Sequence, residues 1–184
     1  MSDNFNGLLS EEEASFLELY QEDLNEIPKL DVIERGNLLS KAKSGNDDAQ
    51  GLLIQEYMGT VIDVTHMYAG QGVLLQDLIG EGNLALVSFF KSLPVDITSD
   101  KLESAVTEEL VKVFDELVKE ASEEENEKLK MLKKVEKVAA AAKKLSDELG
   151  RKVSVEELSE KSKISQKQIR DALKNTANKI EGIE

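Results

Sequence analysis

Two glycines and an alanine in the middle of the chain have the spacing of a phosphate-binding loop. The stretch 76–87 reads QDLIGEGNLALV, in which Gly80, Gly82 and Ala85 spell G-x-G-x-x-A. In dinucleotide-binding proteins this loop follows a strand and opens a helix, and its backbone N–H groups hold a pyrophosphate. Here the preceding residues Gln76–Leu78 are not strand formers, and no later segment reads as the rest of a βαβ unit. We therefore reject a nucleotide site.

The carboxylates and the single histidine are the other groups that could do chemistry. Asp63 and His66 lie three residues apart, and acidic pairs such as Asp47 and Asp48 are frequent. Such pairs are more typical of a solvated helix face than of a catalytic dyad. The sequence contains no cysteine and no P-loop, HExxH or G-x-S-x-G motif. We expect that the chain is not an enzyme and that it uses no cofactor and no metal.

The elements that carry these residues read as helices. Aromatic residues make up 4% of the chain and there are only two prolines, which favours an all-α protein over one with many strands and tight turns. Apolar residues recur at helical spacing in successive segments, and Ser10, Ser154 and Ser165 each begin a capping-box pattern. The expected helices run from Ser10 to Pro28, Asp31 to Lys43, Asp47 or Asp48 to Tyr68, Leu75 to Leu93, from Leu102 onward, Lys128 to Gly150, and after Ser154 and Ser165.

Charge divides the chain into an acidic body and a basic end. The formal net charge is −14, yet residues 128–184 carry fifteen basic and nine acidic side chains. We expect a helical domain at 1–127 and a basic three-helix domain at 128–184, whose last two helices form a helix-turn-helix layout around Lys163. The acidic stretch Ala121–Glu127 is either a helix surface or a linker.

Neither end of the chain reads as a targeting or membrane segment. The amino terminus, MSDNFNGLLSEEE, is polar and acidic, unlike a signal peptide. No run approaches the roughly 18–20 apolar residues of a membrane span. We expect a cytoplasmic protein without a membrane partner.

The two glycines of the central helix need another explanation. Each glycine inside a helix costs about 1 kcal/mol relative to alanine. Close approach of a neighbouring helix is one compensating reason. Docking of a partner protein next to Asp77, Glu81 and Asn83 is the other, and both remain open.

The same stretch resembles a known family. Asp77–Val87, DLIGEGNLALV, resembles the D-L-I-Q-E-G-N-I-G-L-M segment of housekeeping bacterial RNA polymerase sigma factors, the sigma-70 family. About two thirds of the chain is similar to that family. The other similar segments are Tyr20–Pro28, Ala42–Ala49, Leu53–Gly72, Leu149–Arg151, Val155–Leu158 and Ile164–Ile169.

The resemblance implies a sigma-like helical core and a protein partner. In the family this helix docks on the clamp coiled coil of the largest subunit of core RNA polymerase. The resemblance therefore implies polymerase contacts for Asp77, Glu81, Asn83 and Val87. Carboxylates on one helix face suit pairing with a basic coiled coil. The chain departs from the pattern at Gly80, where the family usually has a glutamine.

The basic last domain offers a candidate DNA contact. Lysines there can pair with phosphates, although they also suit the solvated face of an amphipathic helix. The candidates are Lys133, Lys134, Lys143, Lys144 and Lys152.

Two further departures concern promoter DNA. The family melts DNA with a cluster of aromatic and basic residues on which bases stack. Residues 95–127 contain no tryptophan and a single phenylalanine, Phe114, with twelve acidic and three basic side chains. The sequence up to Glu184 also has no counterpart of the family's final promoter-reading domain, so we expect a divergent and truncated relative.

Three functions stay open. The first is a sigma factor that binds polymerase and acts in transcription initiation, touching promoter DNA through its basic domain. The second is a sigma-like regulator or mimic that binds polymerase or an anti-sigma protein without melting DNA. The third is a helical interaction protein whose likeness to the family is only architectural.

Overall fold

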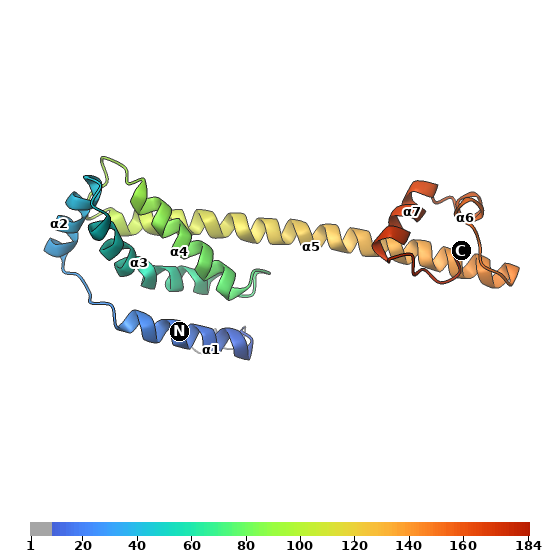
Figure 1. Ribbon diagram of the computed structural model, residues 1–184, viewed down its shortest axis with the longest axis horizontal. Coiled ribbons are helices and arrows are strands. Elements are labelled where there is room, and N and C mark those ends of the chain that lie inside the picture. Colours follow the sequence, from blue (N-terminus) through green and yellow to red (C-terminus); the bar gives the residue numbers. More distant parts are fainter. Residues whose placement is uncertain (1–8) are drawn as a thin grey trace. The chain divides into compact units, whose positions relative to one another are not determined.

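The computed structural model describes residues 9–184, and every regular element within that range is a helix (Figure 1). The all-α prediction is confirmed. The nearest approach to a strand among these residues is an isolated parallel bridge between Val153 and Ile183. The helices are α1 Glu11–Asn25, α2 Val32–Lys43, α3 Asp47–Tyr68, α4 Leu75–Lys91, α5 Leu102–Leu149, α6 Val155–Ser162 and α7 Gln166–Asn175.

Side-chain caps fix where most of these helices begin. Ser10, Ser154 and Ser165 form the capping boxes that the sequence predicts, and Asp31 forms a fourth at the start of α2. The predicted cap of α3 was wrong, because Asp47 and Asp48 lie in its first turn. Asn46 caps α3 instead: its backbone is extended, and its side-chain oxygen Oδ1 accepts the N–H of Ala49 at 2.8 Å.

The chain divides into two compact units, Met1–Ser122 and Glu123–Glu184. The helix α5 contributes its first part to unit 1 and its second part to unit 2. The functional domains expected at 1–127 and 128–184 stay a prediction.

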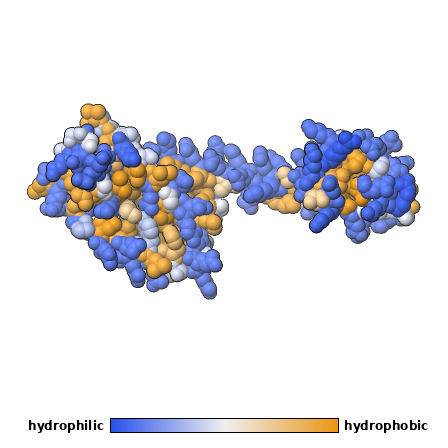
Figure 2. Space-filling view, viewed as in Figure 1, coloured by the Kyte–Doolittle hydropathy of each residue, from blue (hydrophilic) through white to orange (hydrophobic). Residues whose placement is uncertain are grey.

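The acidic stretch Ala121–Glu127 is helical, and the boundary between the two units falls within it. It lies inside α5, a single helix of 48 residues. All side chains from Ser122 to Lys134 are exposed, and the middle of α5 is mostly hydrophilic in Figure 2. Alternating runs of glutamate and lysine with high helix propensity keep the backbone helical here without burial.

The core of unit 1 lies where α3, α4 and the first part of α5 meet. Its largest fully buried side chains include Phe90 and Phe114. The ring of Phe114 packs edge-on against Tyr68, with 5.3 Å between ring centroids. Helix α2 packs on α3 through Leu39 and Ala42.

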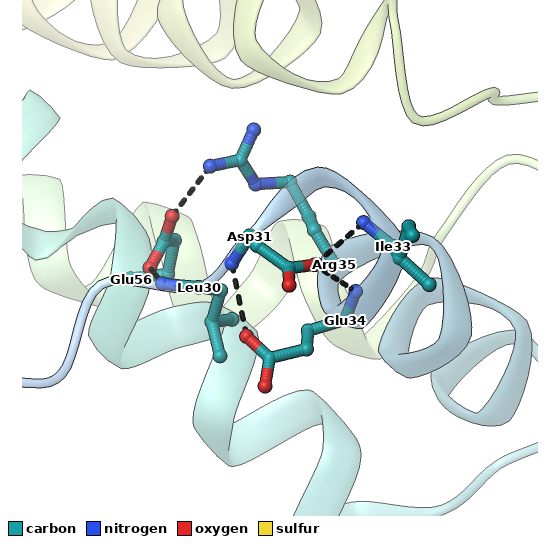
Figure 3. A network of polar contacts seen from close by, with 6 residues as sticks. All are labelled: Leu30, Asp31, Ile33, Glu34, Arg35 and Glu56. Carbon is teal, nitrogen blue, oxygen red and sulfur yellow. Dashed lines mark hydrogen bonds and ion pairs between the residues drawn. The ribbon is translucent and has the colours of Figure 1, made fainter.

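An ion pair joins the first turn of α2 to α3 (Figure 3). Arg35 Nη2 lies 2.6 Å from Glu56 Oε1, and both side chains are largely shielded from solvent. The other carboxylate oxygen of Glu56 accepts the N–H of Leu30 at 3.1 Å. Asp31 in turn accepts the N–H groups of Ile33 and Glu34. The network fixes the turn that leads from α1 into α2.

Unit 2 is built from the second part of α5 with α6 and α7. Its core includes Val138, Ala142, Leu158 and Ile169. Lys163 ends α6 in the left-handed conformation, with φ at 59°, which makes the turn of the predicted helix-turn-helix layout. No helix in residues 9–184 is long and apolar enough to cross a membrane.

Candidate functional site

The exposed face of α4 presents two carboxylates one turn apart. Residues i, i+3, i+4 and i+7 of a helix share a face, and Asp77, Gly80, Glu81 and Leu84 are all exposed. The opposite face carries Leu78 and other side chains that fill the core. The amphipathic pattern of α4 therefore orients Asp77 and Glu81 away from the core, on a surface that also exposes 58% of Leu84.

The two glycines of α4 have different surroundings. A Cβ on Gly82 would lie 2.6 Å from Val61 Cγ1 and 3.0 Å from Phe114 Cζ, closer than real Cβ atoms come. A Cβ on Gly80 would meet no atom within 4 Å. Close packing of α3 and α5 against α4 therefore requires Gly82. It does not explain Gly80, which lies on the exposed face.

Asn83 and Val87 lie beside that face and not on it, and both are half-buried. The Asn83 amide is bound to α1: Tyr20 Oη donates to Asn83 Oδ1 at 3.0 Å, and Asn83 Nδ2 donates to Tyr20 Oη at 2.8 Å. Burial raises the pKa of Tyr20, so the phenol keeps its proton. Of the four residues that the resemblance implies as contacts, the structure brings Asp77 and Glu81 together and engages Asn83 internally.

A second contact from α1 reaches the start of α4. Leu74 occupies the cap position there and supplies no side-chain hydrogen bond. Glu13 Oε1 accepts the N–H of Leu75 at 3.1 Å instead, while its other oxygen completes the capping box with Ser10. Hydrogen bonds from the Ser10 and Leu75 N–H groups hold the pKa of Glu13 below its usual value. Glu13 thus caps two helices, which sequence spacing alone could not indicate.

Residues 95–127, which we expect to lack promoter-melting side chains, contain one phenylalanine, Phe114, and its ring lies in the core. Phe114 is 0% exposed. Its neighbour Asp115 accepts a hydrogen bond from Tyr68 Oη at 2.7 Å. Burial, followed by this hydrogen bond, raises the pKa of Tyr68 to about 12. The aromatic groups nearest to this part of α5 therefore face inward and offer no surface for base stacking.

The five lysines predicted to contact DNA are all exposed in unit 2. Lys133 and Lys144 lie eleven residues apart on α5, which places them on one side of the helix, whereas Lys143 is rotated by about 100° from Lys144. Lys137 lies one turn after Lys133, on the same side and also exposed. Its i, i+4 spacing from Lys133 could have indicated from the sequence that Lys137 belongs to the same basic side of the helix.

A groove borders this lysine side between α5 and α7. Its volume is about 470 Å³. Lys130, Lys134 and Lys174 line it together with the apolar side chains of Met131 and Val135. Of the five predicted lysines, Lys134 lines this groove, and Lys144 lines a second hollow between α5 and α6.

A salt bridge holds the turn that carries the fifth lysine, Lys152. Arg151 donates from Nη1 and Nη2 to both carboxylate oxygens of Glu157, at 3.0 and 2.6 Å. The Arg151 guanidinium and then the Ser154 N–H lower the pKa of Glu157 to about 2. Arg151 is thus engaged in shaping the loop between α5 and α6.

Comparisons with known proteins bear on both units. Residues 133–180 match the family model described as sigma-70 region 3. The chain is an all-helical protein similar to the sigma-70 factors of bacterial RNA polymerase. The resemblance expected from the sequence is confirmed.

Several similar proteins are RNA polymerase sigma factors. RNA polymerase sigma factor SigA of a Bacillus species is 21% identical over 156 residues, which cover 85% of this chain and 41% of that protein. The SigA proteins of Listeria monocytogenes and Clostridium acetobutylicum are each 22% identical over the same shares. The chain therefore spans about two fifths of the length of these relatives.

Proposed function

We propose that the chain is a sigma-like protein that binds core RNA polymerase through the exposed face of α4 and acts in transcription initiation. The observation that supports this most is the pair of outward-facing carboxylates, Asp77 and Glu81. They lie within the stretch similar to SigA, since that stretch covers 85% of the chain and α4 lies in its middle. Two carboxylates one turn apart suit charge-assisted bonds to a basic helix, such as the clamp coiled coil of the largest subunit.

Neutralising these carboxylates tests the docking. The doubly substituted chain Asp77→Asn, Glu81→Gln should bind core polymerase at least about tenfold more weakly than the unchanged chain, because two charged contacts are lost while side-chain shape is kept. Affinity is measured by retention of purified core polymerase on the immobilised full chain.

A matched variant controls for net charge. Glu116 and Glu120 are also exposed and one turn apart, on α5. The chain with Glu116→Gln and Glu120→Gln should bind as the unchanged chain does. If both double variants bind polymerase equally weakly, the binding depends on general charge attraction and not on the face of α4. If the unchanged chain does not retain polymerase, the proposal is contradicted outright.

A second candidate function is a regulator that binds polymerase, or an anti-sigma protein, without melting DNA. The burial of Phe114 and the acidic outer face of α5, including Glu108 and Glu116, favour it. Unpaired bases need aromatic faces and positive charge, whereas residues 95–127 bury their phenylalanine and carry twelve acidic side chains against three basic ones.

Promoter opening separates the two candidates. If the chain is the regulator, polymerase loaded with it should leave thymines near the start site resistant to permanganate, because the buried ring of Phe114 is not available to stack on unpaired bases. Polymerase loaded with a SigA protein on its own promoter is the positive control. Permanganate-reactive thymines with this chain would exclude the regulator and support the sigma factor.

The basic side of unit 2 is the proposed DNA contact in the first candidate. Of the five lysines predicted from the sequence, Lys133 and Lys144 share this side with Lys137, and phosphate contacts by lysine weaken steeply as salt rises. Contact through this surface accordingly implies salt-sensitive binding to duplex promoter DNA.

A further inference from the structure

The helix α1 packs on the flank of the proposed docking helix α4 (Figure 1). Two polar contacts hold it there. Tyr20 occupies both the oxygen and the nitrogen of the Asn83 amide, and Glu13 caps the N–H of Leu75. Asn83 lies one turn from Gly80, so an amide at this position borders the exposed face at Gly80. While α1 is in place, Tyr20 occupies one N–H and one oxygen lone pair of that amide, and Asn83 is half-buried.

The anchoring of α1 is slight for a helix of 15 residues. Leu17 is its one buried side chain, in a small cluster with Ile62, Leu75 and Ile79 that is separate from the main core. The other apolar side chains of α1 that pack against this cluster are only partly buried: Phe16, Tyr20 and Leu24. Few buried contacts place a segment at the low end of local stability. The mostly exposed segment 26–29 joins α1 to Leu30, whose N–H is held by Glu56. The anchored point thus comes after this segment, so α1 can move about it while α2 stays in place.

The end of α1 is not stabilised by charge. The helix carries six acidic residues and no basic one, so its last turn has no cation to offset the helix dipole.

We propose that α1 is a displaceable cover that withholds Asn83 from the docking surface until a basic helical partner binds. The proposal rests on the docking of polymerase through Asp77 and Glu81. In the closed state the carboxylates alone are available. Opening frees the Asn83 amide and uncovers the apolar side chains of Leu75 and Ile79. Affinity for the partner is then reduced by the fraction of chains that are closed.

Removing one hydroxyl tests the cover. Tyr20→Phe keeps the ring but breaks both hydrogen bonds to Asn83. We expect the full-length variant to bind core polymerase about three- to tenfold more tightly, the range that follows from losing one or two internal hydrogen bonds. Adding Asn83→Ala to Tyr20→Phe should abolish the gain. The matched control is Tyr68→Phe, which removes a hydroxyl bound to Asp115 elsewhere in unit 1 and should leave the affinity unchanged.

Amide hydrogen exchange of the unbound chain gives a readout without polymerase. Amides of α1 should exchange faster than those of α3, and Tyr20→Phe should accelerate α1 alone. Equal protection of α1 and α3 would overturn the cover.

The outcomes separate this proposal from the docking itself. If Asp77→Asn, Glu81→Gln weakens binding while Tyr20→Phe leaves it unchanged or weaker, docking stands and the cover fails. If no form of the chain retains polymerase, docking fails. Hydrogen exchange then decides whether α1 opens, and slow exchange throughout α1 would overturn the cover as well.

Discussion

Replacing Phe114 by alanine is expected to lower the free energy of unfolding of unit 1 by about 3–5 kcal/mol. The ring is fully buried, packs edge-on against Tyr68 and lies against the backbone of α4 at Gly82. Its removal loses apolar burial and leaves a cavity at the junction of α3, α4 and α5. Small domains are stable by only about 5–15 kcal/mol, so this change takes a large share of the total. Denaturant unfolding followed by circular dichroism measures it.

Phe89 provides the matched control. It is the same residue type, in the same cluster, but only partly buried at its edge. Phe89→Ala should cost less than half as much as Phe114→Ala. Equal losses would mean that the ring of Phe114 is not the centre of this core, and the argument that it is withheld from DNA would weaken with it.

The two glycines of α4 should respond to alanine with opposite signs. Gly82→Ala should destabilise unit 1 by about 1–3 kcal/mol, because the new methyl group meets Val61 and Phe114 in a filled core. Gly80→Ala should stabilise it by about 1 kcal/mol, because the site is open and alanine favours the helix. Midpoints of thermal unfolding measure both.

The Gly80 substitution also bears on function. A methyl group on the exposed face adds little bulk, so polymerase binding by Gly80→Ala should match that of the unchanged chain if Gly80 faces open space in the complex too. Loss of binding with a gain in stability would mean that a partner backbone approaches Gly80 closely. A loss of stability would contradict the surroundings described for this position.

Local signals were sufficient to predict the helices. Serine and glutamate three residues apart marked the starts of α1 and α6, and apolar spacing marked α3 and α4. The predicted capping residue of α3 was Asp47 or Asp48 instead of Asn46. All three consecutive residues are of types that can cap a helix, and only the extended backbone of Asn46 decides among them. The continuity of α5 was left open because its acidic stretch is helix-compatible but buries nothing.

The site was predictable only in part. The outward direction of Asp77 and Glu81 follows from the period of α4. The engagement of Asn83 does not, because its partner Tyr20 lies 63 residues away along the chain. The different surroundings of Gly80 and Gly82 likewise depend on Val61 and Phe114, which belong to other helices. Spacing along one helix cannot report what another helix brings to it.

The half-covered docking face has a kinetic consequence. In the proposed complex the two exposed carboxylates meet the partner first, so they set the association rate and make it sensitive to ionic strength. Asn83 becomes available only after α1 moves, so its contribution falls on the lifetime of the complex. Encounter and residence would then be governed by different residues of the same helix, and selection could tune one without altering the other.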